Sequence, residues 1–233
     1  MSSADRVAAA AARTVAAGTA RLFAAWSKGS PIPAEADRRC EGLADFATRR
    51  ALVWQIPLGT VGLAAKFIER HEGDKVREIG EPQQMIYDGA NAYLHVGDKW
   101  TGFFLSDPAG PRTINDPLWP LDALFGVRDA VDLGDDVVRG GAATRYGVTI
   151  DLTRADAALS AGVTVPAGPY RALSQIPAEV WLDSVDRAAR ISVRTDAEAG
   201  GDPIWSVVEL WDFGVAADIV PPVEVVPPRE AYS

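Results

Sequence analysis

The feature that most constrains this chain is an alternation of apolar and polar residues that recurs through most of the sequence after Arg38. Its clearest stretch runs from residue 137 to residue 152, and one side of it carries Thr144, Tyr146, Val148, Ile150 and Leu152. Successive side chains of a β-strand point to opposite faces, so a period of two predicts strands. We therefore expect a protein built mainly from sheet.

Short polar turns connect the predicted strands. Turns at residues 49–50, 71–74, 89–91, 97–98 and 184–186 are rich in Gly, Asp, Asn and Arg. Such turns join neighbouring antiparallel strands. The strands are expected at residues 40–46, 52–56, 63–70, 76–79, 85–88, 92–96, 100–105, 137–152, 179–183, 188–195 and 204–213.

Two helices are expected beside this sheet, with a short third one at residues 153–159 capped by Thr153. Apolar residues three or four positions apart predict an amphipathic N-terminal helix over about residues 4–27, with Ser2-Ser3 as its cap. Asp116-Pro117 begins another helix that ends before Gly126 and that we expect to cross the sheet as a lid.

Together these patterns predict an α+β fold: a curved antiparallel half-barrel sheet with an N-terminal amphipathic helix and one or two helices on its concave face. We expect one domain over residues 1–233, with the sheet and its lid helix at about 38–220 and an extended Pro-rich tail at 221–233. Helices on a curved sheet can leave part of the apolar face as a cleft.

Composition excludes several functions. The 233-residue chain carries 32 acidic and 23 basic residues, a formal charge of −9, and this charge disfavours binding to nucleic acid or to anionic membranes. Cys40 is the single cysteine, and His71 and His95 are the two histidines. We therefore expect no disulfide, no metal site, no cofactor and no catalytic set.

The order of several short motifs resembles a known family. These motifs are Asp116-Pro117, Val138-Arg139-Gly140, Thr144-Arg145-Tyr146, Val180-Trp181-Leu182-Asp183 and Glu209-Leu210-Trp211-Asp212-Phe213-Gly214 before Pro221-Pro222. The succession resembles the actinobacterial LolA-like lipoproteins of the LppX/LprG type, over about 200 residues. The sequence as given shows neither the signal segment nor the lipid-attachment cysteine of that family.

This resemblance implies a half-barrel enclosing an apolar cavity that accommodates acyl chains or other lipophilic molecules. The family's ligand residues form no fixed motif, so the expected cavity wall comes from aromatic residues of the predicted strands and lid. The candidates are Trp54, Phe67, Tyr87, Tyr93, Trp100, Phe104, Trp119, Phe125 and Tyr146.

Three functions are compatible with such a fold. The first is a non-enzymatic carrier or binding protein for a lipophilic small molecule. The second is an enzyme of the cyclase or isomerase type that uses the same cavity, with a carboxylate drawn from Asp45, Asp88, Asp183, Glu209 and Asp212. The third is a regulatory module that binds a partner protein through a strand edge or the Pro-rich tail.

The compartment and the membrane relationship follow from the same sequence. No segment is apolar and long enough to span a membrane, so we expect a soluble protein. As written, the chain is expected in the cytoplasm; a chain cut after a removed signal would instead be exported or act in the cell envelope.

Overall fold

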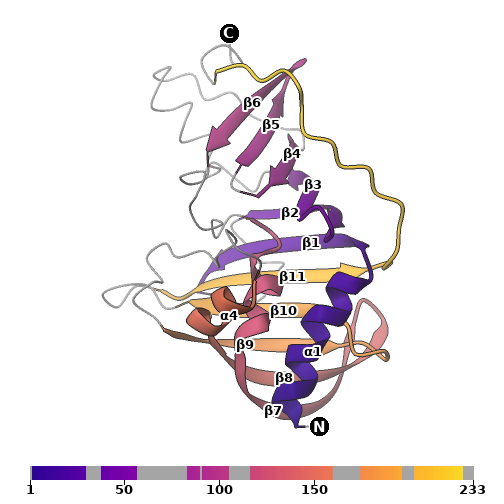
Figure 1. Ribbon diagram of the computed structural model, residues 1–233, viewed down its shortest axis with the longest axis vertical. Coiled ribbons are helices and arrows are strands. Elements are labelled where there is room, and N and C mark those ends of the chain that lie inside the picture. Colours follow the sequence, from indigo (N-terminus) through magenta and orange to yellow (C-terminus); the bar gives the residue numbers. More distant parts are fainter. Residues whose placement is uncertain are drawn as a thin grey trace.

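The protein is a single continuous antiparallel sheet with helices packed on one face (Figure 1). The computed structural model describes residues 2–29, 38–56, 83–89, 91–104, 116–159, 174–195 and 202–227. The sheet has eleven strands in the order β6-β5-β4-β3-β2-β1-β11-β10-β9-β8-β7. The strands are β1 (Thr19–Lys28), β2 (Arg38–Asp45), β3 (Arg50–Ile56), β4 (Gln83–Asp88), β5 (Asn91–Val96), β6 (Lys99–Phe104), β7 (Val127–Val138), β8 (Gly141–Asp151), β9 (Gln175–Leu182), β10 (Ala188–Thr195) and β11 (Ile204–Trp211).

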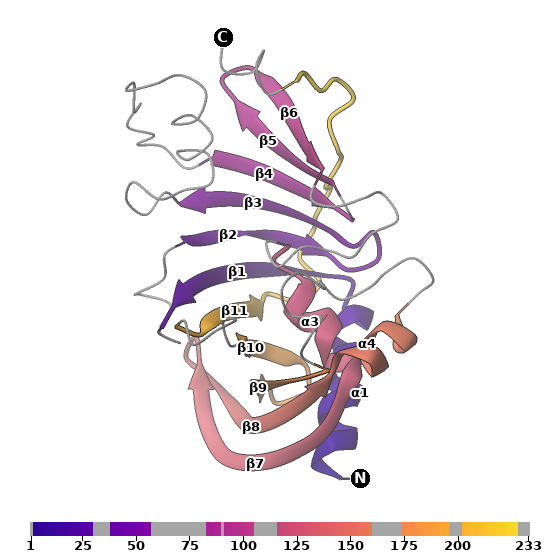
Figure 2. The same cartoon turned by 90° about the vertical axis from the view of Figure 1, so that its left-hand side faces the viewer.

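The two halves of the sheet meet at β1. This strand pairs with β2 on one side and with β11 on the other, so the first and last strands of the chain lie next to each other. The sheet is strongly curved at β7 and β8 (Figure 2). We call the face that carries the helices the inner face and the opposite face the outer face.

Helix α1 (Ser3–Ala16) lies on the inner face of the β7–β10 region. Ser2 is its N-cap and forms a capping box with Asp5, which satisfies free N–H groups of the first turn. Val7, Ala10 and Ala11 are buried in the main core. Arg6 donates a 2.8 Å hydrogen bond to Tyr146 Oη, and the Thr14 hydroxyl accepts one of 2.9 Å from Ala188 N.

The N-terminal helix is shorter than the sequence predicted. It ends at Ala16, Gly18 adopts a φ of +81°, and β1 begins at Thr19. Leu22 and Trp26, which we assigned to the helical stripe, lie on one face of β1. A spacing of four keeps two residues on one side of either a helix or a strand, so it did not distinguish them. Phe23 and Ala25, on the other face, are buried as well.

The inserted helix is α3 (Trp119–Ala123), continued by the 3-10 turn η3 (Leu124–Gly126). Asp116 is fully buried, and its Oδ1 accepts a 2.8 Å hydrogen bond from Leu118 N just before the helix. Every residue of α3 is buried, and the helix contacts β10, β11 and α4. Helix α4 (Leu152–Ala158) is capped by Asp151, which accepts from Arg154 N, and not by Thr153 as predicted.

One strand was missed. Residues 127–138 form β7 and residues 141–151 form β8, with a turn at Arg139-Gly140, whereas the sequence predicted one strand over residues 137–152. Most of β7 is exposed and it lies at an edge of the sheet, where alternation need not match burial. Four aspartates within the strand hid its β character.

The segment after β11 runs back across the molecule to the far edge (Figure 1). Ile219 is buried, and its carbonyl accepts a hydrogen bond from Arg50 Nη1. Val226 N donates a 2.8 Å hydrogen bond to Trp100 O, and Val226 forms a parallel bridge with Thr101 of the edge strand β6. The tail is extended at a sheet edge, as the prolines predicted, up to its last described residue, 227.

The predicted fold class is therefore confirmed: the protein is an α+β half-barrel with helices on the concave inner face of a curved antiparallel sheet. The predicted β2–β3, β4–β5 and β9–β10 hairpins are present. The hairpin expected over residues 63–79 lies outside the described residues.

Gly42 tests the close approach of β2 and β3. A Cβ atom on Gly42 would lie 1.9 Å from the carbonyl oxygen of Leu52, a backbone atom that can move only with its strand. We expect Gly42→Ala to lower the free energy of unfolding by roughly 3 kcal/mol, the upper range for overpacking. Gly141→Ala is the control, because its nearest neighbour would be 3.4 Å away. Equal denaturation midpoints for the two variants would contradict the close approach.

Candidate functional site

The inner face of β1–β6 is the surface on which a lipophilic ligand was expected. Its residues form rows across the strands, because paired residues of antiparallel strands share a face. One row is made of short side chains around a single ring: Ala20, Ala44, Ala51, Tyr87 and Ala92. The next row is larger and contains Leu22, Gly42, Val53, Met85, Leu94 and Thr101.

Helices cover the inner face unevenly. In the described part of the chain, the principal helix contacts are with β7–β11: α1 packs on β7–β10, and α3 on β10 and β11. Arg49, in the turn between β2 and β3, forms an ion pair with the buried carboxylate of Asp122 in α3. This pair fixes α3 relative to the β2–β3 hairpin. The apolar surface of β2–β6 thus continues past the region that these helices chiefly contact.

The structure divides the nine aromatic candidates between the two faces. Tyr87, Trp119 and Tyr146 are buried in the main core on the inner side, and Phe125 packs against them from η3. These four share one apolar interior, as expected for residues that line or underlie a ligand site.

The other candidates lie elsewhere. Trp54 and Tyr93 lie on the outer face, since each is offset by one position from an inner-face residue, and Trp100 pairs with His95 on that same outer side. Trp54 is 41% exposed, and Tyr93 lies under the tail, near Val225. Phe104 pairs with Asn91 in the backbone register, but its side chain, like all of Phe67, lies outside the described residues.

Three buried polar side chains lie near one another on the inner side of the sheet: Cys40, Tyr87 and Asp116. Burial raises the pKa of the Cys40 thiol to about 12, and the Asp116 carboxylate contributes in the same direction. Burial also raises the pKa of Tyr87, and Arg38 opposes that rise. Arg38 lies 4.5 Å above the ring of Trp26. Both Cys40 and Tyr87 are therefore neutral at physiological pH, which keeps the inner face apolar.

Two buried polar atoms on this side have no hydrogen-bond partner within the described chain, namely Trp119 Nε1 and Thr101 Oγ1. Sequence analysis counted Trp119 only as an aromatic wall and did not identify Thr101 at all. Buried N–H and O–H groups are almost always satisfied, so each is a point where water or a ligand atom could bind. An apolar pattern gives no signal for such atoms.

The carboxylates considered for catalysis are each held by local partners. Glu209 is buried between Arg139 and Arg190, and Asp88 pairs with Arg50. Asp183 and Asp212 pair with Arg187 and Arg21, and Asp45 accepts from the N–H groups of Ala47 and Thr48. These contacts give the five carboxylates structural roles. The described residues also bring together no group of three potential metal ligands.

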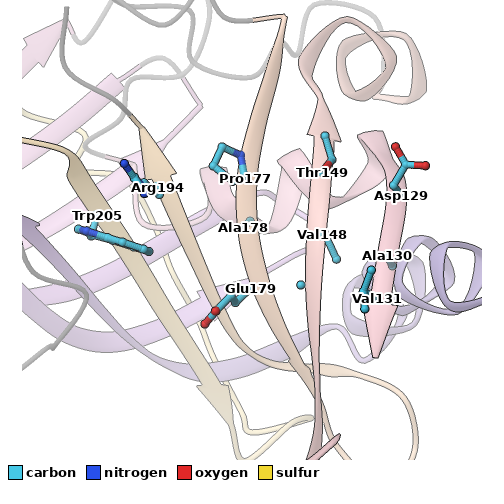
Figure 3. Close-up of a pocket in the computed structure, with 11 residues that line it drawn as sticks. Asp129, Ala130, Val131, Val148, Thr149, Pro177, Ala178, Glu179, Arg194 and Trp205 are labelled. Atoms are coloured by element: carbon cyan, nitrogen blue, oxygen red, sulfur yellow. The ribbon is translucent and has the colours of Figure 1, made fainter. Parts of the chain in front are cut away.

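A hollow of about 410 Å³ opens on the outer face, over β7–β11 (Figure 3). Gly147 has no side chain, Val131 forms one wall, and the ring of Trp205 forms the opposite wall. Asp129, Thr149 and Glu179 lie around it. The sequence pattern gives no signal for this hollow, which lies where Gly147 pairs with Val131 of β7 and Glu179 of β9.

The fold is shared with two mycobacterial proteins of known structure, one of them a lipoprotein. The structure of LppX from Mycobacterium tuberculosis aligns with a TM-score of 0.54 and 12% identity, covering 93% of this chain and 99% of that one. LprF from Mycobacterium bovis aligns with a TM-score of 0.56 and 12% identity, covering 94% and 96%. No protein-family model matches the sequence, and no curated protein does. The predicted LppX-type fold is confirmed. Among the described helices, none is long and apolar enough to cross a membrane.

Cys40 reports on the integrity of the inner face. Because its thiol is buried and its pKa is about 12, we expect iodoacetamide to label it at pH 8 only at the rate of unfolding. The folded pKa exceeds the unfolded one, so the thiol's contribution to stability is complete below about pH 9 and is lost as the pH rises towards 12. Labelling of the native protein as fast as a free thiol would show that the face is open at Cys40.

Proposed function

We propose that this protein is a non-enzymatic carrier that binds a lipophilic small molecule or acyl chain against the inner face of its half-barrel. The observation that carries the proposal is the apolar inner face of β2–β6, whose residues are mostly buried and lie beyond the strands that α1 and α3 chiefly contact. The fold shared with LprF and with LppX, which is named as a lipoprotein, favours the same use.

Binding would be driven by burial of apolar surface. Transfer of apolar area from water contributes roughly 25 cal/mol per Å², which suffices for an acyl chain without any charged contact. The row of short side chains around Tyr87 is buried, so a flat or linear ligand would bind there inside the half-barrel and not on an open surface. Specificity would then come from shape, with Trp119 Nε1 or Thr101 Oγ1 available to a polar atom of the ligand.

The carrier role is favoured over catalysis by the state of the polar groups. The five carboxylates are engaged by arginines or backbone N–H groups, and the Cys40 thiol has a raised pKa. The place of action is part of the proposal: likeness to lipoproteins favours the cell envelope over the cytoplasm.

Met85 and Leu52 provide a matched test. Both are half-buried residues of adjacent strands, but Met85 lies on the inner face and Leu52 on the outer face. After organic extraction, each protein is titrated with the fluorescent fatty acid cis-parinaric acid. We expect Met85→Glu to weaken binding at least tenfold, because a charge would lie against the acyl chain. Leu52→Glu should leave binding unchanged.

Thermal denaturation of the same two variants separates binding from folding. We expect similar melting temperatures, since both positions retain contact with water. Equal loss of binding in the two variants, or unchanged binding in Met85→Glu, would remove the inner face as the ligand site.

A further inference from the structure

The two edge strands of the sheet differ in whether another segment pairs with them. The β6 edge is bridged by Val226 of the tail. The opposite edge strand, β7, pairs only with β8 in the described part of the protein (Figure 1). An unpaired edge presents a row of free backbone N–H and C=O groups, to which another chain can bind.

The outer side of β7 also exposes apolar side chains. Val131 is 65% exposed and Leu133 is 50% exposed, although both are large aliphatic residues. Leu133 lies at a bulge between Asp132 and Gly134, and this places its side chain over Gly147. β7 carries aspartates, as protected edge strands do, but two large aliphatic residues exposed next to each other at its outer side indicate a contact surface.

The outer hollow adjoins these two residues. Val131 is part of its wall, and Gly147, which has no side chain, leaves room for a bulky group between β7 and Trp205 (Figure 3). In protein interfaces, an aromatic or aliphatic anchor in such a hollow carries most of the binding energy. The hollow therefore provides an anchor site next to an exposed apolar strip.

The charge of β7 indicates which kind of partner would bind there. β7 carries Asp129, Asp132, Asp135 and Asp136 against the single cation Arg128 of the same strand, and the hollow is lined by the carboxylates of Asp129 and Glu179 and by Arg194. The Asp136 carboxylate accepts a 2.7 Å hydrogen bond from Trp181 Nε1, which lowers its pKa and keeps it ionised. Pairing of β7 with β7 of a second copy would bring these carboxylates together, whereas a basic partner would be attracted to them.

We propose that β7 and the adjoining outer hollow form a docking surface for a basic protein that inserts one bulky apolar side chain into the hollow. The surface lies on the face opposite to the proposed lipid site, so the two proposals are independent. Backbone pairing with the β7 edge would align the basic residues of the partner with the aspartates.

The test uses a short peptide of alternating lysine and valine with one central phenylalanine, added to isotopically labelled protein and followed by amide NMR. We expect the amide chemical shifts of β7 and of Gly147 to change when the peptide binds. Replacing lysine by glutamate, or the phenylalanine by glycine, should weaken binding at least tenfold, or about 1.4 kcal/mol.

Gly147→Leu should weaken binding of the peptide to the same extent, because its side chain fills the hollow and its Cβ meets only the Leu133 side chain, at 3.4 Å. Gly141→Leu is the control on the same strand. Removing two charges from β7, by Asp129→Asn with Asp132→Asn, should weaken binding. The matched control removes two charges outside β7, by Asp202→Asn with Asp218→Asn, and should leave binding unchanged.

Three results would overturn the proposal: equal binding of the glutamate peptide, equal binding of the peptide without phenylalanine, or unchanged binding to Gly147→Leu. Analytical sedimentation tests a fourth outcome, the formation of a dimer. A dimer that forms with rising protein concentration and is lost in Gly147→Leu would assign the surface to a second copy instead.

Discussion

The pairing of β1 with both β2 and β11 is the interaction on which the rest of the structure depends. It joins the N-terminal hairpins to the C-terminal ones in one sheet of eleven strands. The junction before β1 is fixed from two directions, because Phe46 N donates to Gly18 O and Gly214 N donates to Thr19 O. The left-handed Gly18 thus sets where α1 leaves the sheet and where β1 enters it.

This junction also determines which surfaces remain for function. α1 folds back from Gly18 onto β7–β10, and α3 lies on β10 and β11, so both helices are concentrated on one half of the inner face. The other half keeps a buried apolar inner face, while the tail contacts Arg50 through the Ile219 carbonyl and pairs with the edge strand β6 through Val226. Inner lipid binding and outer partner binding would therefore use different faces of the same sheet, and neither would have to displace the other.

Sequence reasoning predicted the sheet well because its turns are explicit. Gly89 and Asp186 adopt positive φ, as the turn residues suggested.

The sequence pattern could not assign residues to the inner or the outer face, since the strands of β1–β6 carry apolar residues on both sides. Trp54 beside Val53, and Tyr93 beside Leu94, look equivalent in the sequence, yet only Val53 and Leu94 lie on the inner face. The end of α1 and the strand β7 were missed because tertiary pairing outweighed local pattern. The outer hollow depends on register between β7, β8 and β9, which no single segment encodes.

The central claim is that the inner face holds a lipophilic molecule, and native mass spectrometry of the purified protein tests it most directly. The account predicts a mass above that of the polypeptide. Denaturation should release a lipid into organic solvent, and the protein should bind that lipid again when it is added back. A mass equal to the bare chain, together with no change when an excess of fatty acids and phospholipids is added, would contradict it.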